Sequence, residues 1–431
     1  MDDMWSATEL SKGERASPKA QPATQDFSNR FVEYYEQRAC IPGTLIVSEA
    51  TIIARNAAGC HNAPGIWSEA QIEAWKKITA AVHAKGCIIY CQLWHQGRAA
   101  HPNVLEAQGF RLLSSSAVPI DSQEQTLEAM TDSEIADTIV DYATAAKNAI
   151  AAGFDGVEIH GANGYLPDQF LQTTCNKRED RWGGSIENRA RFHLEVTKAV
   201  IAAVGAQRTA MRLSPYSDFN GMLMQDPKPT FRYLLAQLKP LGLSYLHLIE
   251  ARIKGNDDAD CGGQESVAWM VKEWDNASPI VLAGGFKPAS VGQTVDCEYQ
   301  DYDVIIAFGR YFVSNPDLVF RVRERIPLTG AKLWSNVANG PPTTAVVRST
   351  DLAKKDGPWI TACGGHMHGR IRAACPVASE KACATPPARV GRTHVLNTQH
   401  AGAYASNHRL KKSDRTRSRL PAVFQARNDT A

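Results

Sequence analysis

The chain has 431 residues, 44% of them hydrophobic, which is enough for one large domain or for two to three ordinary ones. No stretch approaches the roughly 18 apolar residues of a membrane span, and the first residues lack the apolar core of a secretory signal. The ten cysteines are scattered without repeated Cys-x-x-Cys pairs, so a disulfide-stapled secreted domain is not indicated. We therefore expect a reduced, cytoplasmic protein with no membrane partner.

The formal net charge of +2 conceals two regions of opposite sign. Residues 340–431 carry 15 Lys and Arg against 5 Asp and Glu, whereas residues 1–339 carry 32 against 40. This contrast and the loss of periodicity toward the end predict three segments. They are an atypical N-terminal segment over 1–25, a globular domain over 26–335, and a basic, poorly ordered C-terminal extension over 336–431.

From Gly43 to about Pro327, short apolar strands alternate with amphipathic stretches of helical length. The predicted strands are Thr44–Ile53, Cys87–Trp94, Gly156–His160, Thr209–Ser214, Tyr245–Glu250, Pro279–Ala283 and Asp303–Ala307. The predicted helices are Ser68–Lys85, Thr131–Ala152, Ser185–Val204, Pro229–Leu241, Gln264–Trp274, Pro288–Val295 and a last one after Asn315.

These repeated units predict an α/β fold with a parallel sheet, of the TIM (β/α)8 barrel type. Runs such as Ile88–Tyr90 are continuously apolar, as expected for strands covered on both faces. Only seven strands are predicted, because Met1–Gln25 contains no strand-like run. We therefore expect the first strand of the barrel to be missing and the edges at Thr44–Ile53 and Asp303–Ala307 to be unpaired.

Ligand chemistry in such barrels lies at the carboxyl ends of the strands, and two polar residues stand there. Gln92 can hydrogen-bond the imide edge of a flat ring through its carbonyl and amide together, or it can be an ordinary barrel-interior glutamine. Arg212 can meet an anion or a carbonyl-rich ligand, or it can form a buried salt bridge with Glu158 or Glu250. The sequence leaves both alternatives open.

The last two predicted strands end in glycines. Gly284 and Gly285 follow one strand, and Gly309 and Arg310 follow the next. Glycines at these positions let backbone N–H groups approach a phosphate, and the arginine supplies positive charge. In a complete eight-stranded barrel of this type, the loops after the last two strands form the usual phosphate site. We therefore predict a phosphate-binding site at the ends of Pro279–Ala283 and Asp303–Ala307.

A histidine, an asparagine and a tyrosine follow one another at the end of the strand Gly156–His160. A lone histidine at a strand end is more often structural than catalytic, but Asn163 and Tyr165 come just beyond it. His160 and Asn163 can both donate to one oxygen, and Tyr165 is a weak acid with an ordinary pKa of about 10. This combination suits a reaction that pushes electrons into a carbonyl oxygen and protonates a carbon.

The C-terminal extension holds residues that two other ligand classes can use. Cys363, His366 and His368 precede further cysteines, but the spacings match no familiar zinc site, so we expect no metal. The basic cluster Arg409–Arg419 can touch nucleic acid, but a solvated segment is favoured. We expect a small-molecule substrate and no nucleic-acid partner.

Over about Phe31 to Trp334, the chain resembles the old yellow enzyme family of flavin-dependent ene-reductases. Within that family it is most similar to the fungal branch that serves secondary metabolism. The motifs that carry the resemblance are Glu33–Ala39, Ser48–Thr51, Pro64–Trp67, Ala81–Gly86, Gln92–Arg98, His160–Tyr165, Arg181–Arg189, Phe308–Phe312 and Ser314–Leu318.

The resemblance implies a barrel that holds FMN in its mouth and takes hydride from NADPH, with NADH as an alternative. The implied reaction reduces the C=C bond of an α,β-unsaturated aldehyde or ketone. His160 and Asn163 would bind the substrate oxygen, and Tyr165 would be the proton donor. The implied flavin-binding residues are Ala50, Gln92, Arg212, Gly284, Gly285, Gly309 and Arg310.

Two alternative functions are set against this one. The chain lacks the strand, of the type Asn-Arg-Ile-Val-Met-Ala-Pro-Met-Thr-Arg, with which family members begin, so it can instead be a truncated homologue with impaired flavin binding and little or no catalysis. A flavin-free lyase or aldolase would need a lysine at a strand end. Lys254 lies in a polar loop, so this alternative is disfavoured.

Overall fold

The computed structural model describes residues 21–61, 63–120, 126–251, 253–254, 257–258, 265–330 and 344–347. By packing, the chain divides after Arg370, and all described residues lie in the first unit, Met1–Arg370. The zinc alternative at Cys363–His368 and the basic cluster Arg409–Arg419 therefore lie outside the described residues, as does nearly all of the predicted extension.

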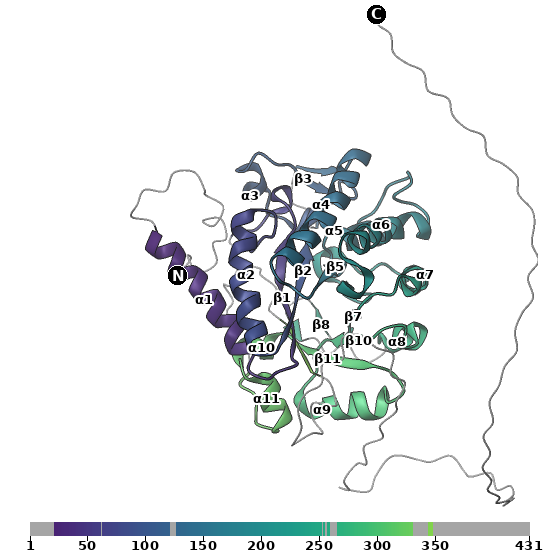
Figure 1. Ribbon diagram of the computed structural model, residues 1–431. Coiled ribbons are helices and arrows are strands. Elements are labelled where there is room, and N and C mark those ends of the chain that lie inside the picture. Colours follow the sequence, from purple (N-terminus) through teal and green to yellow (C-terminus); the bar gives the residue numbers. More distant parts are fainter. Residues whose placement is uncertain are drawn as a thin grey trace, which may run out of the picture. The chain divides into compact units, whose positions relative to one another are not determined.

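A ring of parallel strands confirms the predicted TIM-type fold (Figure 1). The strands are neighbours in the order β1, β2, β5, β6, β7, β10 and β11. Each predicted strand is present, with ends that differ by no more than a few residues from the expected ones. Their bounds are β1 Leu45–Ile52, β2 Ile88–Trp94, β5 Gly156–His160, β6 Thr209–Leu213, β7 Leu246–Ile249, β10 Ile280–Ala283 and β11 Val304–Phe308.

Helices cover the outside of this ring (Figure 1). Each predicted helix is found, although the one after β10 continues as a π-helix over Gln293–Glu298 (η6). Their bounds are α2 Glu69–Ala84, α4 Asp132–Ala151, α6 Ile186–Val204, α7 Lys228–Leu238, α8 Ala268–Trp274, α9 Pro288–Gly292 and α11 Leu318–Arg323. A short helix that was not predicted, α10 (Arg310–Ser314), precedes the last of them.

Capping residues explain where two of the helices, α2 and α4, begin. The Ser68 side chain accepts from the Gln71 N–H, and Gln71 in turn accepts from the Ser68 N–H, which forms a capping box at the start of α2. Thr131 and Glu134 form the same arrangement at the start of α4. Each box satisfies N–H groups that the helix itself cannot pair, a contribution of about 1 kcal/mol.

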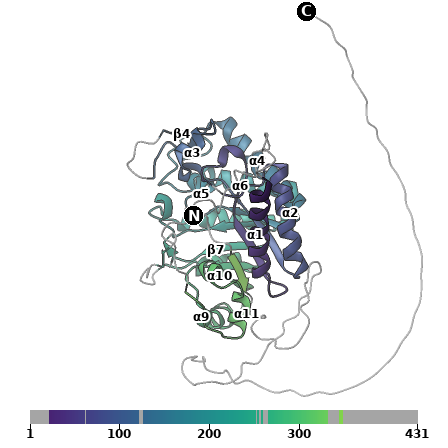
Figure 2. The same ribbon diagram turned by 90° about the vertical axis from the view of Figure 1, so that its left-hand side faces the viewer.

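The chain enters the barrel through a helix that the sequence did not predict, α1 (Gln21–Arg38), which lies alongside α2 (Figure 2). The Tyr35 ring is fully buried and meets the Trp75 ring edge-on at 5.8 Å between centroids. Arg38 donates to the carbonyl of Val313 at 2.9 Å, which fixes α1 against α10. No strand precedes β1 among the described residues, which begin at Gln21.

The predicted open edges, however, are paired. The short strand β12 (Thr344–Val347) lies between β11 and β1, antiparallel to both, and closes the ring. Val346 is opposite Leu45 on one side and Ala307 on the other. The expectation of an open barrel was wrong because a segment from the predicted extension pairs the backbone groups at the edges of β1 and β11.

The barrel interior is filled by alternate residues of the strands, because successive side chains point to opposite faces. Ala210, Tyr245, Val281, Ile305 and Ala307 pack together there as a buried cluster. A larger core lies between the strands and the helices, and every residue of β5 is buried. This alternation decides which polar residues face inward toward the candidate site.

Within the described part of the chain, no helix is long and apolar enough to cross a membrane.

Several short elements outside the repeated units were not predicted. The additional elements are α3 Pro102–Glu106, β3 Leu112–Ser114, β4 Leu127–Ala129, α5 Leu166–Leu171, β8 Ile253–Lys254, β9 Asp257–Asp258, and the 3₁₀ turns Arg55–Ala57, Gly97–Ala99, Ala206–Arg208, Phe219–Gly221 and Lys239–Leu241.

Candidate active site

His160 is the last residue of β5 and its side chain is fully buried. Its neighbour in the sheet register is Arg212 of β6, whose Nη1 lies 3.4 Å from His160 Nε2. A guanidinium can only donate, so this contact makes Nε2 the acceptor and leaves the ring proton on Nδ1. Burial lowers the pKa of His160 well below its ordinary value, so the imidazole is neutral. The Nδ1–H is buried and has no partner among the described residues.

Tyr165 lies directly against His160. The two rings meet edge-on with their centroids 4.8 Å apart, and the Trp94 ring also meets Tyr165 edge-on at 5.1 Å between centroids. Burial raises the pKa of Tyr165 above its ordinary value, so the phenol keeps its proton. The predicted pairing of a neutral donor with a weak acid is therefore present in the fold.

Asn163 lies between these two residues on a turn of unusual backbone conformation. Asn163 and Gly164 both have positive φ, 57° and 71°. The Asn163 N–H donates to Ser214 Oγ at 2.7 Å, and its carbonyl accepts from Asn220 Nδ2 at 3.0 Å. Because the backbone is held from both sides while the side-chain amide has no hydrogen bond to a described residue, the amide can serve a ligand.

Two buried polar residues that the sequence analysis missed hold this turn. Asp168 Oδ2 accepts from the Gly164 N–H at 2.9 Å, and its Oδ1 accepts from Gln172 Nε2 at 2.8 Å. The Gln172 amide cannot turn around, because its carbonyl accepts from the N–H groups of Leu223 and Met224. The loops after β5 and β6 are thereby locked together.

Gln169 uses its whole side-chain amide in the same way. Its Nε2 donates to the carbonyls of Gly164 and Gln96 at 2.7 and 2.9 Å. Its Oε1 accepts from the Arg98 N–H at 3.1 Å and from Ser114 Oγ at 2.8 Å. Polar residues in a short buried helix carry no functional pattern in sequence, so only their partners reveal this role.

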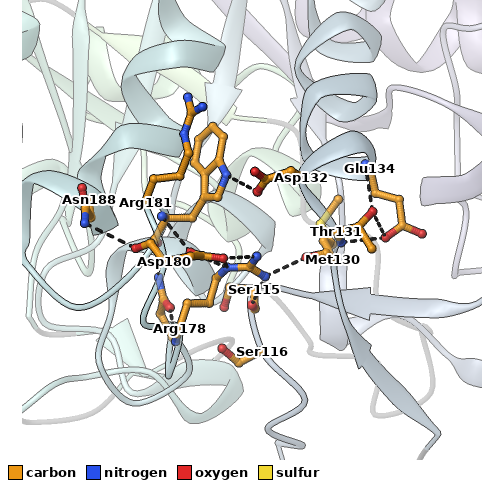
Figure 3. A network of polar contacts seen from close by, with 12 residues as sticks. Ser115, Ser116, Met130, Thr131, Asp132, Glu134, Arg178, Asp180, Arg181 and Asn188 are labelled. Atoms are coloured by element: carbon orange, nitrogen blue, oxygen red, sulfur yellow. Dashed lines mark hydrogen bonds and ion pairs between the residues drawn. The ribbon is translucent and has the colours of Figure 1, made fainter.

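A further polar network joins the loop between α5 and α6 to the residue that follows β3 and to the segment that leads into α4 (Figure 3). Arg178 donates to the carbonyls of Ser115 and Met130 at 3.0 and 2.7 Å and pairs with Asp180 at 2.5 Å. Ser115 Oγ donates to the carbonyl of Gln169 at 2.7 Å. The network therefore supports the helix that carries Asp168 and Gln169.

The other predicted strand-end residues lie around the same mouth. Ala50 of β1 is buried and is opposite Gln92 of β2. Gln92 Nε2 donates to Glu158 Oε1 at 2.6 Å. Arg212 makes no ion pair with a described carboxylate, and its buried Nε has no partner, which removes the salt-bridge alternative within that part of the chain.

The predicted phosphate end lies at the adjoining ends of β10 and β11, where Ala283 is opposite Ala307. Gly284 has φ +123°, and a Cβ there would lie 3.1 Å from the backbone nitrogen of Glu250. A side chain at this φ would be strained and its Cβ would press against Glu250, so glycine is favoured here. Gly285 follows with φ 66°, and Gly309 and Arg310 stand at the start of α10.

These residues fit the FMN that the sequence resemblance implies. The partnerless Arg212 Nε and His160 Nδ1 are buried donors that require an acceptor, such as a flavin carbonyl or a substrate oxygen. Gly284, Gly285 and Gly309 have no side chain that would keep a phosphate from their backbone N–H groups. Among the described residues, no group of three His, Cys, Asp or Glu could hold a metal ion.

Comparison with known proteins agrees with this geometry. The model of the NADH:flavin oxidoreductase / NADH oxidase family matches residues 16–329. Chanoclavine-I aldehyde reductase fgaOx3 of Penicillium roqueforti is 54% identical over 296 residues, 68% of this chain and 80% of the relative. NADP-dependent oxidoreductase lnbE of Aspergillus flavus is 50% identical over 303 residues, 69% of this chain and 80% of the relative.

Two further similarities matter. A protein of Epichloe festucae var. lolii, described as "probable inactive reductase easA", is 50% identical over 300 residues, 68% of this chain and 79% of the relative. The crystal structure of Old Yellow Enzyme from Pichia sp. AKU4542 superposes with a TM-score of 0.64 at 40% identity, covering 70% of this chain and 79% of that one. The chain therefore belongs to the NADH:flavin oxidoreductase / NADH oxidase family, with FMN as cofactor and a nicotinamide as reductant, in the fungal secondary-metabolism branch of the old yellow enzymes.

Proposed function

We propose that this protein is an ene-reductase that reduces the C=C bond of an α,β-unsaturated aldehyde or ketone in the biosynthesis of a fungal secondary metabolite, in the cytoplasm. The observation that carries the proposal is the contact between the neutral imidazole of His160 and the protonated phenol of Tyr165, beside Arg212, whose buried Nε has no partner among the described residues. NADPH is the proposed reductant, supported by the name of the Aspergillus flavus relative, with NADH as an alternative.

FMN, when bound, supplies the hydride that the β-carbon receives. The protein's own groups act on the rest of the substrate. His160 Nδ1–H and the Asn163 amide donate to the carbonyl oxygen, where negative charge develops as the β-carbon is reduced. Tyr165 then gives its proton to the α-carbon, so the net reaction adds one hydride and one proton across the double bond.

The state of each group suits its role. The neutral imidazole of His160 donates one hydrogen bond and carries no positive charge. The phenol of Tyr165, with its raised pKa, stays protonated until a strongly basic carbon forms beside it. Gln92, Arg212 and Ala50 are proposed to face the flavin ring. Gly284, Gly285, Gly309 and Arg310 are proposed to hold its phosphate.

The test separates the two half-reactions in a Tyr165→Phe variant. Flavin reduction by NADPH should stay near the wild-type rate, whereas reoxidation by an enal should slow roughly 10²–10³-fold. Tyr142→Phe is the matched control, because the Tyr142 hydroxyl is buried in α4 without a partner among the described residues. Equal losses in both half-reactions would remove Tyr165 from the proposed role.

The alternative is a homologue with impaired flavin binding and little catalysis. It is favoured by the absence of a strand before β1 in the described chain and by the relative described as inactive. The absorption spectrum of the purified protein distinguishes the two. A protein that stays colourless after FMN is added supports the alternative, and a bound flavin spectrum that NADPH bleaches supports the reductase.

A further inference from the structure

A buried carboxylate lies in the barrel interior, below the proposed flavin site. Glu158 is on β5, two residues before His160, and its side chain is fully buried. Three donors converge on it. Gln92 Nε2 lies 2.6 Å from Oε1, while the Tyr245 hydroxyl and His247 Nδ1 each lie 2.9 Å from Oε2. The proposed reaction gives this cluster no task.

An ionised carboxylate has two oxygens that only accept, so it can pair with all three donors. A protonated carboxyl would direct its own O–H at one of these N–H or O–H groups. Burial alone raises the pKa of Glu158, but its interactions with His247, Arg212 and Gln92 lower it, so the carboxyl stays ionised. Burial lowers the pKa of His247, so this imidazole is neutral and donates its Nδ1–H. Glu158 is therefore a fixed anion that can only accept.

This property decides how the Gln92 amide is turned. An amide can rotate to exchange its carbonyl and its NH₂, but Glu158 accepts only the NH₂. The Gln92 carbonyl is consequently the end left for a ligand, and it accepts no hydrogen bond from a described residue. The pyrimidine edge of a flavin carries an imide N–H between two carbonyls, and that N–H requires an acceptor.

The charge of Glu158 has a second consequence. Arg212 is the register neighbour of both His160 and His247, and it makes no ion pair with a described carboxylate. The buried anion and the guanidinium therefore compensate each other through the barrel interior rather than by contact. A flavin gains negative charge when it is reduced, so a nearby fixed anion opposes its reduction.

We propose that Glu158 is a positioning residue for the flavin: it holds Gln92 with its carbonyl toward the imide N–H, and its charge keeps the reduction potential of the bound flavin low. This inference rests on the proposed flavin site. It assigns a role to a residue that touches neither flavin nor substrate.

Two substitutions separate orientation from charge. In Glu158→Gln, the new amide can donate to the Gln92 carbonyl, so Gln92 can turn and present its NH₂ to the imide N–H. FMN affinity should fall about 10- to 100-fold, as expected for a mispaired buried hydrogen bond, and the flavin potential should become more positive. Glu158→Asp keeps the charge but withdraws the oxygens from Gln92, so affinity should fall while the potential stays near wild type.

Tyr245→Phe is the matched control. It removes one donor from the cluster and leaves both the carboxylate and Gln92 in place. FMN affinity should stay within a factor of about three of wild type, because the lost hydroxyl leaves no donor unpaired and Glu158 Oε2 still accepts from His247. Affinity is measured by quenching of FMN fluorescence on titration with each apoprotein, and potentials are measured by dye-coupled reduction of the bound flavin.

A double substitution tests the route of the effect. If Glu158 acts on affinity through Gln92, Glu158→Gln should weaken FMN binding little further in a Gln92→Leu background. Wild-type affinity and potential in both folded Glu158 variants would overturn the inference. So would fully additive losses in the double variant. A wild-type protein that takes up no FMN would contradict the underlying flavin site instead, and the two failures are distinguishable. If Glu158→Gln does not fold, Glu158→Asp alone decides the orientation effect.

Discussion

At the scale of single residues, Asp168 determines where Asn163 and Tyr165 lie. Its carboxylate accepts from Gly164 and from Gln172 on different oxygens, so Asp168→Asn turns an NH₂ toward one of these two donors. An unpaired buried donor costs about 1–3 kcal/mol, so we expect reduction of an enal to slow about 10- to 100-fold. Flavin reduction by NADPH should be unchanged.

Stopped-flow measurement of the two half-reactions checks this expectation. Asp137→Asn, at an exposed position of α4, is the control for the loss of one negative charge. If Asp168→Asn reduces enals at the wild-type rate, the turn is held by Gln169 and Ser214 alone.

Glu49 makes a second residue-scale prediction, which concerns stability. It is buried on β1, where the Tyr35 hydroxyl lies 3.4 Å from Oε1, and burial raises its pKa to about 7. The folded protein therefore binds this proton more tightly than the unfolded chain does. The free energy of unfolding should decrease as the pH rises from the ordinary glutamate pKa toward 7, and the full cost of about 3 kcal/mol is present above pH 7.

Glu49→Gln removes that cost without removing the acceptor for Tyr35. The variant should match wild type in urea unfolding near pH 4.5 and should exceed it by up to about 3 kcal/mol near pH 8. A difference between the two proteins that does not change with pH would show that Glu49 is not the titrating group.

The residues that sequence reasoning found and missed differ in one physical respect. His160, Asn163 and Tyr165 follow one another past a strand end, so local spacing alone predicts that they meet. Glu158 and Asp168 act through partners on other strands and loops. A buried polar residue gives no signal in one sequence until the fold shows which donors surround it.

At the scale of elements, the same distinction holds. The strands and helices of the repeated units were predictable because apolar periodicity and caps such as Ser68 and Thr131 are local. Strand β12 was not predictable. It is four residues long, it lies beyond the repeated units, and its pairing with β1 and β11 is decided by the edges that those strands leave open.

The closure by β12 predicts a specific sensitivity to proline. Because β12 is paired on both sides, each of its backbone N–H groups is directed at one of the two neighbouring strands, and Val346→Pro removes one of them. We expect faster hydrogen exchange of amides in β1 and β11 and a lower unfolding temperature. Val346→Thr keeps the N–H and is the control.

Exchange in β2, β5 and β6 should change little in the proline variant, because these strands are paired on both sides without β12. Unaltered protection of β1 and β11 in Val346→Pro would mean that the barrel does not depend on this strand for closure.

At the scale of the whole molecule, the unpaired donors of the cofactor site lower the stability of the empty barrel. Arg212 places a cation with a partnerless Nε among buried residues, and His160 leaves an Nδ1–H unpaired beside it. Such groups destabilise the empty barrel and are satisfied only by a ligand. FMN at 100 times its dissociation constant should therefore stabilise the wild-type fold by about 2.7 kcal/mol, a rise of roughly 5–10 °C in the unfolding temperature.

Arg212→Met tests how the guanidinium affects the stability of the FMN-free barrel and the stabilisation that FMN adds. Most of the FMN-induced rise should disappear without the guanidinium, and the empty barrel should itself unfold at a lower temperature, because the buried Glu158 anion loses the cation that compensates it. Arg208→Met is the control, since Arg208 is exposed just before the opposite end of the same strand, β6. It should leave the FMN-induced rise intact. A full FMN response in Arg212→Met would place the flavin away from β6.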